Sequence, residues 1–137
     1  MKRLLAIDYG ERHIGIALSD PGQLIAFPYL TIDTRKILSY FIKIAEIVKD
    51  QDVGKIIIGI PLNTENIETK KSKQVRDFAK ELEKYVHLPI IFWDESYTTQ
   101  KATEVLNIQK KSLKKNKSKL DMIAASLILK DYLTNRK

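Results

Sequence analysis

Short apolar blocks separated by turn-forming residues dominate the first quarter of the chain. The blocks at residues 3–8 and 13–19 predict two strands, because each is brief, apolar and bounded by turn signals. Residues 23–32 predict a third strand, and Pro28 within it favours an edge position, since proline cannot donate to a strand ladder. Three strands joined by tight turns predict an antiparallel meander.

The spacing of apolar residues then becomes helical. Residues 35–50 predict a helix with Asp33 or Thr34 as its N-cap. The continuous β-branched run at 55–60 predicts a strand that is buried on both faces. The remaining expected elements are a helix at 71–86, a strand at 90–93, a short helix at 98–106 and a final helix at 120–133, with a lysine-rich stretch at 109–119 before it.

The predicted order is β-β-β-α-β-α-β-α-α within one domain of 137 residues. Antiparallel strands followed by strands that alternate with helices indicate an α/β fold. We therefore expect a five-stranded mixed sheet with helices on both faces.

Charge and composition narrow the choice of partners. The chain has 24 lysines and arginines against 17 acidic residues, a net charge of +7, which favours an anionic partner such as nucleic acid. The alternative is that the lysines only keep the protein in solution. Cysteine is absent, which excludes disulfides and thiolate metal sites. No apolar run is long enough to span a bilayer or to form a signal peptide, so we expect a cytoplasmic protein without a membrane partner.

Carboxylates occur where strands end and where the last helix begins. Asp8 ends the first strand, Asp94 and Glu95 end the last strand, and Asp121 begins the final helix. Sites in open α/β sheets lie beyond the carboxyl ends of the strands, so these groups are expected to converge. Each also has a structural alternative: a turn cap for Asp8, a solvated strand end for Asp94 or Glu95, and a helix-dipole charge for Asp121.

Clustered carboxylates repel one another unless a cation lies between them. Mg²⁺ and Mn²⁺ are hard ions that take oxygen ligands, and two such ions form the kind of site that hydrolyses phosphodiesters. The pattern therefore predicts a metal-dependent nuclease.

Four segments of the chain resemble the motifs of a known family. DYGERHIGIALSD, IIIGIPLN, FWDESYTT and LDMIAASLIL are similar, in order and spacing, to the signatures of the YqgF (RuvX) family. Its members are ribonuclease H-like proteins described as Holliday junction resolvases and as pre-16S rRNA nucleases. The resemblance covers nearly the whole chain. It implies a ribonuclease H-like fold and a Mg²⁺- or Mn²⁺-dependent hydrolase that acts on structured RNA or branched DNA. It also implies Asp8, Glu95 and Asp121 as the metal-binding catalytic residues, with Asp94 as a further candidate ligand.

The chain departs from the family pattern at two expected arginines, where His13 and Ser96 stand instead. Arginine holds phosphate through two parallel hydrogen bonds that neither residue reproduces. The alternative function is therefore a nucleic-acid-binding module with little or no nuclease activity, acting in ribosome biogenesis or transcription. A homodimer would be expected if the substrate is a four-way junction, because two strands must then be cut.

Basic residues near the predicted carboxylates are the candidate contacts for nucleic acid. Arg12 lies in the turn after Asp8, and Gly10 in the same turn is expected to let the backbone approach a bound phosphate or metal. The remaining candidates form the lysine-rich stretch, expected to be a mobile loop that holds a phosphate backbone, with a plain linker as the alternative: Lys110, Lys111, Lys114, Lys115, Lys117 and Lys119.

Overall fold

The computed structural model describes residues 2–62, 69–94 and 117–136. Three strands come first: β1 (Arg3–Tyr9), β2 (His13–Ser19) and β3 (Ala26–Asp33). They are followed by α1 (Tyr40–Asp50), β4 (Val53–Ile60), α2 (Lys70–Leu82), β5 (Ile90–Asp94) and α5 (Lys117–Asn135). The predicted order of strands and helices is confirmed through β5, and a final helix is present. The short helix predicted at 98–106 lies outside the described residues.

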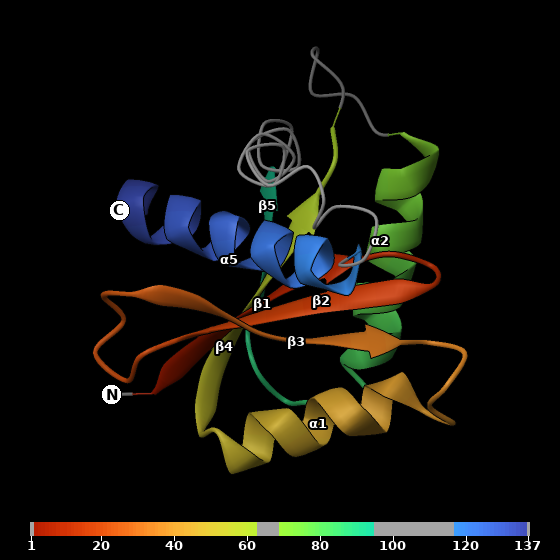
Figure 1. The fold of residues 1–137 in the computed structure, drawn as a ribbon, viewed down its shortest axis with the longest axis horizontal. Coiled ribbons are helices and arrows are strands. Elements are labelled where there is room, and N and C mark those ends of the chain that lie inside the picture. The colour runs from red at the N-terminus through yellow and green to blue at the C-terminus, as the bar shows by residue number, and fades with distance from the viewer. Residues whose placement is uncertain (1, 63–68, 95–116, 137) are drawn as a thin grey trace.

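The strands form a five-stranded mixed sheet in the order β3-β2-β1-β4-β5 (Figure 1). β1 and β2 are antiparallel, as are β2 and β3, whereas β4 runs parallel to both β1 and β5. The carboxyl ends of β1 and β5 therefore lie at the same edge of the sheet, on either side of β4. This arrangement is the one that the carboxylate prediction requires.

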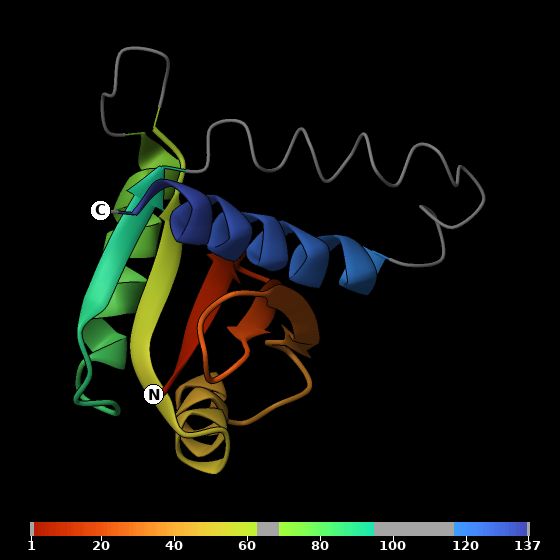
Figure 2. The ribbon, with the colours of Figure 1, turned by 90° about the vertical axis from the view of Figure 1, so that its left-hand side faces the viewer.

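Helices cover both faces of the sheet (Figures 1 and 2). Alternate residues of β1 point to opposite faces, as a strand requires. Leu5 and Ile7 belong to the larger core, which includes buried residues of α1 and α2. Leu4 and Ala6 belong to a smaller core beneath α5. No helix in the described ranges has the length and apolar character that crossing a membrane demands.

The strand that contains Pro28 lies at the edge of the sheet, as predicted. Ile16 pairs with Leu30 and the next residue, Ala17, pairs with Pro28, so Tyr29 is an extra residue in the β3 ladder. A bulge and a proline together interrupt the hydrogen-bonding edge of this strand.

The N-cap predicted for the first helix is wrong. α1 begins later, and its N-cap is Ser39, whose hydroxyl accepts a hydrogen bond from the Ile42 amide at 3.3 Å. The Thr34 hydroxyl instead donates to the carbonyl oxygen of Glu11 at 2.7 Å, and the Asp33 carboxylate accepts from a nearby backbone amide. The Thr34 hydroxyl thus stabilises the junction between the β1–β2 turn and the end of β3. The helix begins only at Tyr40, so neither Asp33 nor Thr34 caps it.

Two other helix boundaries differ from the prediction. α2 ends at Leu82, and the next three residues form a turn. α5 begins at Lys117, so the last residues of the predicted lysine-rich loop are helical instead. Lys117 and Lys119 therefore belong to the first turn of the helix that carries Asp121.

A buried serine joins the start of β1 to the end of β2. Ser19 has no exposed surface, and its hydroxyl accepts a hydrogen bond from the Leu4 amide and donates one to the Asp20 carbonyl oxygen, both at 2.8 Å. The Arg3 guanidinium donates to the carbonyl oxygen of Ser19 at 3.0 Å. The hydroxyl thus satisfies a backbone amide that has no access to water.

We expect Ser19→Ala to lower the free energy of unfolding by about 1–3 kcal/mol, because the Leu4 amide would be left buried without an acceptor. Urea denaturation followed by circular dichroism measures this loss. Thr134→Ala is the matched control, since its hydroxyl bond to Lys130 is exposed, and it should change stability by less than about 0.5 kcal/mol. Equal stability of the Ser19→Ala and wild-type proteins would contradict the assignment.

Candidate metal and nucleic-acid site

Asp8 lies near the carboxyl end of β1 on the face of the sheet that α5 covers. Leu4 and Ala6 pack against α5 from that face, and the alternation of the strand places Asp8 with them. The Asp8 side chain is only partly buried. The buried part of the strand thus fixes a carboxylate at the point where the apolar face ends.

Gly15 of β2 stands directly opposite Asp8 in the antiparallel pair. A Cβ atom on Gly15 would collide with the carbonyl group of Asp121 and would lie 2.9 Å from the amide nitrogen of Met122. The backbone of α5 therefore occupies the space of the missing side chain. Directly opposed residues of an antiparallel pair have Cα atoms only about 5 Å apart. The fold thus places the backbone of Asp121 against the β1–β2 pair at the position of Asp8.

Small residues continue this close packing along α5. Ala124 and Ala125, one turn beyond Asp121, are both buried. Ala125 packs in the same core as Leu4 and Ala6. A larger side chain at either alanine would lift the helix off the sheet, because interiors are packed without spare volume.

The end of β5 separates the two adjacent acidic candidates. Asp94 pairs with Ile60 and follows Phe92 by two positions, and both of those residues lie on the α1/α2 side of the sheet. Asp94 is therefore placed on the face opposite to Asp8. Glu95 lies outside the described residues. Within the described ranges, no three acidic or histidine side chains are grouped closely enough to hold a metal ion.

Trp93 connects β5 to α5 on the face that carries Asp8. Its indole Nε1 donates to the Asp131 carboxylate at 2.7 Å, and its ring meets Tyr132 edge-on with centroids 5.2 Å apart. The Asn135 amide donates to the other Asp131 oxygen at 2.9 Å. α5 is thus held near its start by contact with Gly15 and near its end by Trp93. Sequence reasoning did not identify this second contact, because no local pattern pairs residues so far apart.

The turn between β1 and β2 has its own requirement for glycine. A Cβ atom on Gly10 would lie 2.6 Å from the carbonyl oxygen of His13, so closure of the turn itself demands the glycine. His13 faces Asp33 across the β2–β3 pair, with 3.9 Å between Nε2 and the nearer carboxylate oxygen. The Arg12 side chain is exposed, while its backbone carbonyl oxygen accepts from the Thr34 amide. Arg12 therefore has a fixed backbone next to the end of β1.

Two lysines occur at the start of α5. Lys117 and Lys119 lie in its first turn, which contains no acidic residue, and the Lys119 side chain is exposed. The partial positive charge of a helix N-terminus adds to theirs. The other lysines of the predicted nucleic-acid contact lie outside the described residues: Lys110, Lys111, Lys114 and Lys115.

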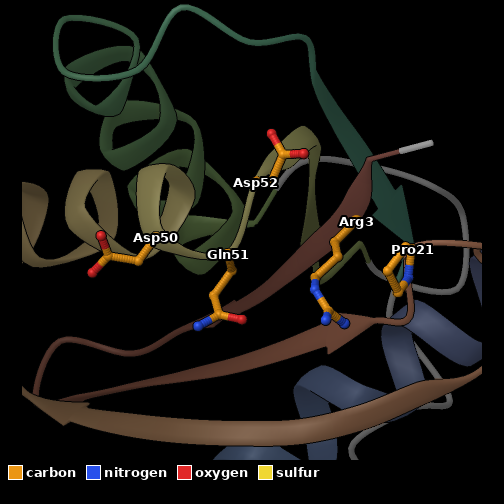
Figure 3. A pocket seen from close by; sticks show the side chains of 5 residues that line it. All are labelled: Arg3, Pro21, Asp50, Gln51 and Asp52. Carbon is orange, nitrogen blue, oxygen red and sulfur yellow. The ribbon is translucent and has the colours of Figure 1, made fainter.

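A hollow of about 280 Å³ lies at the opposite end of the strands from Asp8 and is not part of this site (Figure 3). Arg3, Pro21 and the segment 50–52 line it, at the amino-terminal ends of β1 and β4. Its one guanidinium, that of Arg3, already donates to Ser19. The hollow is thus separated from Asp8 by the length of β1.

Comparison with known proteins identifies relatives that match almost the whole chain. The profile of a family described as "RuvX: Holliday junction resolvase" matches residues 2–135. A protein of Maridesulfovibrio salexigens named "Putative pre-16S rRNA nuclease" is 37% identical over 96% of this chain and 97% of its own length. A protein of Syntrophus aciditrophicus with the same name is 39% identical over 96% of this chain and 87% of its own length.

Solved structures share the fold at much lower sequence identity. The structure titled "T. thermophilus RuvC in complex with Holliday junction substrate" superposes with a TM-score of 0.58 at 13% identity, covering 96% of this chain and 95% of that one. A structure of Thermus thermophilus RuvC alone gives a TM-score of 0.56 with the same coverage. These similarities confirm the ribonuclease H-like fold class and carry no information about substrate.

We expect Gly15→Ala to lower the free energy of unfolding by about 1–3 kcal/mol, because the new methyl group must push the α5 backbone away from the sheet. Chemical denaturation measures the loss. Gly22→Ala is the control, since Gly22 is exposed and its nearest neighbour, at 3.1 Å, is a side-chain oxygen of Asp20 rather than backbone. Equal free energies of unfolding for Gly15→Ala and Gly22→Ala would contradict the close contact between the α5 backbone and Gly15.

Proposed function

The chain belongs to the RuvX family, and from this premise we propose that it is a divalent-metal-dependent nuclease that hydrolyses phosphodiester bonds in structured nucleic acid. The observation that carries the proposal is the contact of α5 with Gly15, which brings Asp121 beside Asp8 on one face of the sheet. Acids held on one face of a sheet repel one another, and a cation bound between them offsets that cost.

The donor set fits a hard divalent cation. Asp8 and Asp121 are both partly buried acids at the carboxyl edge of the sheet, and carboxylate oxygens are the ligands that Mg²⁺ and Mn²⁺ prefer. We assign Asp8, Glu95 and Asp121 as the metal-binding catalytic residues for two ions. Asp94 is set aside, because two neighbouring strand residues cannot point to one face without a bend and Asp94 lies with Phe92. When bound, such ions activate water and stabilise the leaving oxygen of a phosphodiester.

The residues around these acids are suited to orient a polyanion. The first turn of α5 contributes two lysines and the positive end of the helix, and Arg12 projects from the neighbouring turn. Phosphate groups are attracted to such a surface, and contacts of this type position a strand without reading its sequence. We include Lys110, Lys111, Lys114 and Lys115 in this contact because of their proximity in sequence.

The substrate classes we propose are precursor 16S rRNA, at its 5′ end, and Holliday junctions. The two relatives described above are named for precursor 16S rRNA, and the family description names the Holliday junction. The site of action would be the cytoplasm. Symmetrical cleavage of a junction would in addition require a homodimer.

One observation supports a second candidate function, that of a nucleic-acid-binding module with little nuclease activity. His13 stands where the family pattern has an arginine. Its Nε2 lies 3.9 Å from the Asp33 carboxylate. A histidine paired with an acid binds phosphate more weakly than a free guanidinium, which donates two parallel hydrogen bonds and carries a permanent positive charge.

We expect Asp8→Asn and Asp121→Asn each to reduce Mn²⁺-dependent cleavage by more than about 100-fold, because each removes a direct ligand. Asp94→Asn is the matched control and should retain cleavage, because its side chain lies on the other face. Gel assays on single-stranded RNA, duplex RNA and a DNA four-way junction measure the rates and identify the substrate. Full activity of Asp8→Asn would contradict the metal assignment.

Calorimetric titration with Mn²⁺ separates the two candidate functions. The nuclease predicts binding to the wild-type protein that Asp8→Asn abolishes and Asp94→Asn preserves. The binding module predicts nucleic-acid binding without carboxylate-dependent uptake of Mn²⁺. If the heat of Mn²⁺ binding is the same for the wild-type and Asp8→Asn proteins, the binding module is favoured.

A further inference from the structure

A second hollow lies on the α1/α2 side of the sheet, on the face that does not carry Asp8. Its volume is about 390 Å³, and it lies between the end of β1 and the two helices. We call it the aromatic–acidic cavity. It is lined by the rings of Tyr9, Phe41 and Phe78 and by the carboxylates of Glu11, Asp77 and Glu81. Nothing in the proposed cleavage reaction uses these residues.

The aromatic part of the cavity is a continuous cluster of rings. Phe78 is at its centre, with centroid distances of 4.4 Å to Tyr9, 5.4 Å to Phe41 and 6.2 Å to Tyr40. Phe41 also lies nearly parallel to Tyr85, 5.1 Å away. Tyr9, Tyr40 and Phe41 are only partly buried, so ring surface remains accessible from the cavity. Ring faces carry negative electrostatic potential and attract cations.

The acidic part surrounds these rings with negative charge. The side chains of Glu11, Asp77 and Glu81 are all exposed. Glu11 accepts a hydrogen bond from the Gln74 amide at 2.8 Å, which joins the β1–β2 turn to α2. Glu81 pairs with Lys84 at 2.9 Å, but both side chains are more than half exposed, and a surface pair of this kind contributes little stability. A competing cation can therefore replace Lys84.

The chain already places its own cations against aromatic rings on this side of the sheet. Lys71 Nζ lies 5.5 Å from the centre of the Tyr9 ring. The Arg76 guanidinium lies 4.9 Å from the centre of the Phe92 ring, further along α2. The pKa of Tyr9 is raised by burial, by Tyr40 and by Glu11, so its phenol is neutral at physiological pH.

We propose that the aromatic–acidic cavity binds an arginine side chain from a basic segment of a partner protein. A guanidinium is planar, so it can lie against the partly exposed ring surface of the cavity while its edge donates to Asp77 or Glu81, a combination that an ammonium group cannot match. Nucleic acid is disfavoured here, because three carboxylates repel phosphate. On a chain of net charge +7, a local acidic cavity selects a basic partner and directs it to the face opposite the proposed cleavage site.

Fluorescence anisotropy with two labelled peptides tests the proposal on the full chain. The peptides have the same sequence except that one carries arginines and the other citrullines, which are neutral and nearly isosteric. The arginine peptide should bind saturably and about tenfold more tightly, and its affinity should fall as salt is raised. Equal binding of the two peptides, or no binding of the arginine peptide, would overturn the proposal.

Variants locate the binding on the protein. Asp77→Asn combined with Glu81→Gln should weaken the arginine peptide about fivefold, and Phe41→Leu about threefold. Glu46→Gln, an exposed acid elsewhere on α1, should leave the affinity unchanged. If the double variant binds as tightly as the wild type, the cavity is not the site. The double variant changes only exposed groups, so it keeps the test decisive even if Phe41→Leu is unstable.

Cleavage assays on the same variants distinguish this proposal from the proposed function. The Asp77→Asn, Glu81→Gln double variant should cleave nucleic acid at the wild-type rate, because its substitutions lie on the other side of the sheet. Asp8→Asn should bind the arginine peptide normally. Loss of peptide binding in Asp8→Asn would mean that the peptide occupies the carboxylate site instead, which would overturn the cavity assignment.

Discussion

The absence of one side chain determines how α5 packs against the sheet. Gly15 leaves a gap in the sheet, and the backbone of α5 fills it at Asp121. Because Gly15 is the cross-strand partner of Asp8, the same contact that seals the core also brings together two acids separated by more than a hundred residues. Trp93 and its hydrogen bond to Asp131 then fix the direction in which the helix crosses the sheet. Packing and site geometry therefore depend on the same few atoms.

Much of this arrangement is predictable from the sequence, for identifiable reasons. The strands were predictable because their apolar runs are short and clearly bounded, and Pro28 correctly indicated an edge. The carboxylate positions followed from strand order, since parallel strands end at a common edge. The N-cap of α1 was not predictable from composition, because Thr34, Asp33 and Ser39 are all good capping residues. The hydrogen bonds distinguish them: the Thr34 hydroxyl bonds the neighbouring turn, whereas the Ser39 hydroxyl accepts from the first turn of the helix.

Other features depend on contacts that no local pattern contains. The sequence predicted that Gly10 leaves room for a bound phosphate or metal, and the structure adds a second reason for the glycine: the carbonyl oxygen of His13 lies where a side chain would be. The face of the sheet on which Asp94 lies required the register of β5 against β4, which places Asp94 beside Ile60. The aromatic–acidic cavity was missed because its rings come from three separate elements, each of which reads as ordinary core when taken alone.

The irregular edge strand has a consequence for assembly. A regular edge strand offers a row of amides and carbonyls to which any extended segment can add, including the same strand of another copy. In β3, Pro28 has no amide hydrogen and Tyr29 shifts the register by one residue. Such an edge resists continuous strand addition, which protects the chain from fibrous aggregation on this side. Two copies would then associate through helices or side chains at this edge, rather than by merging their sheets.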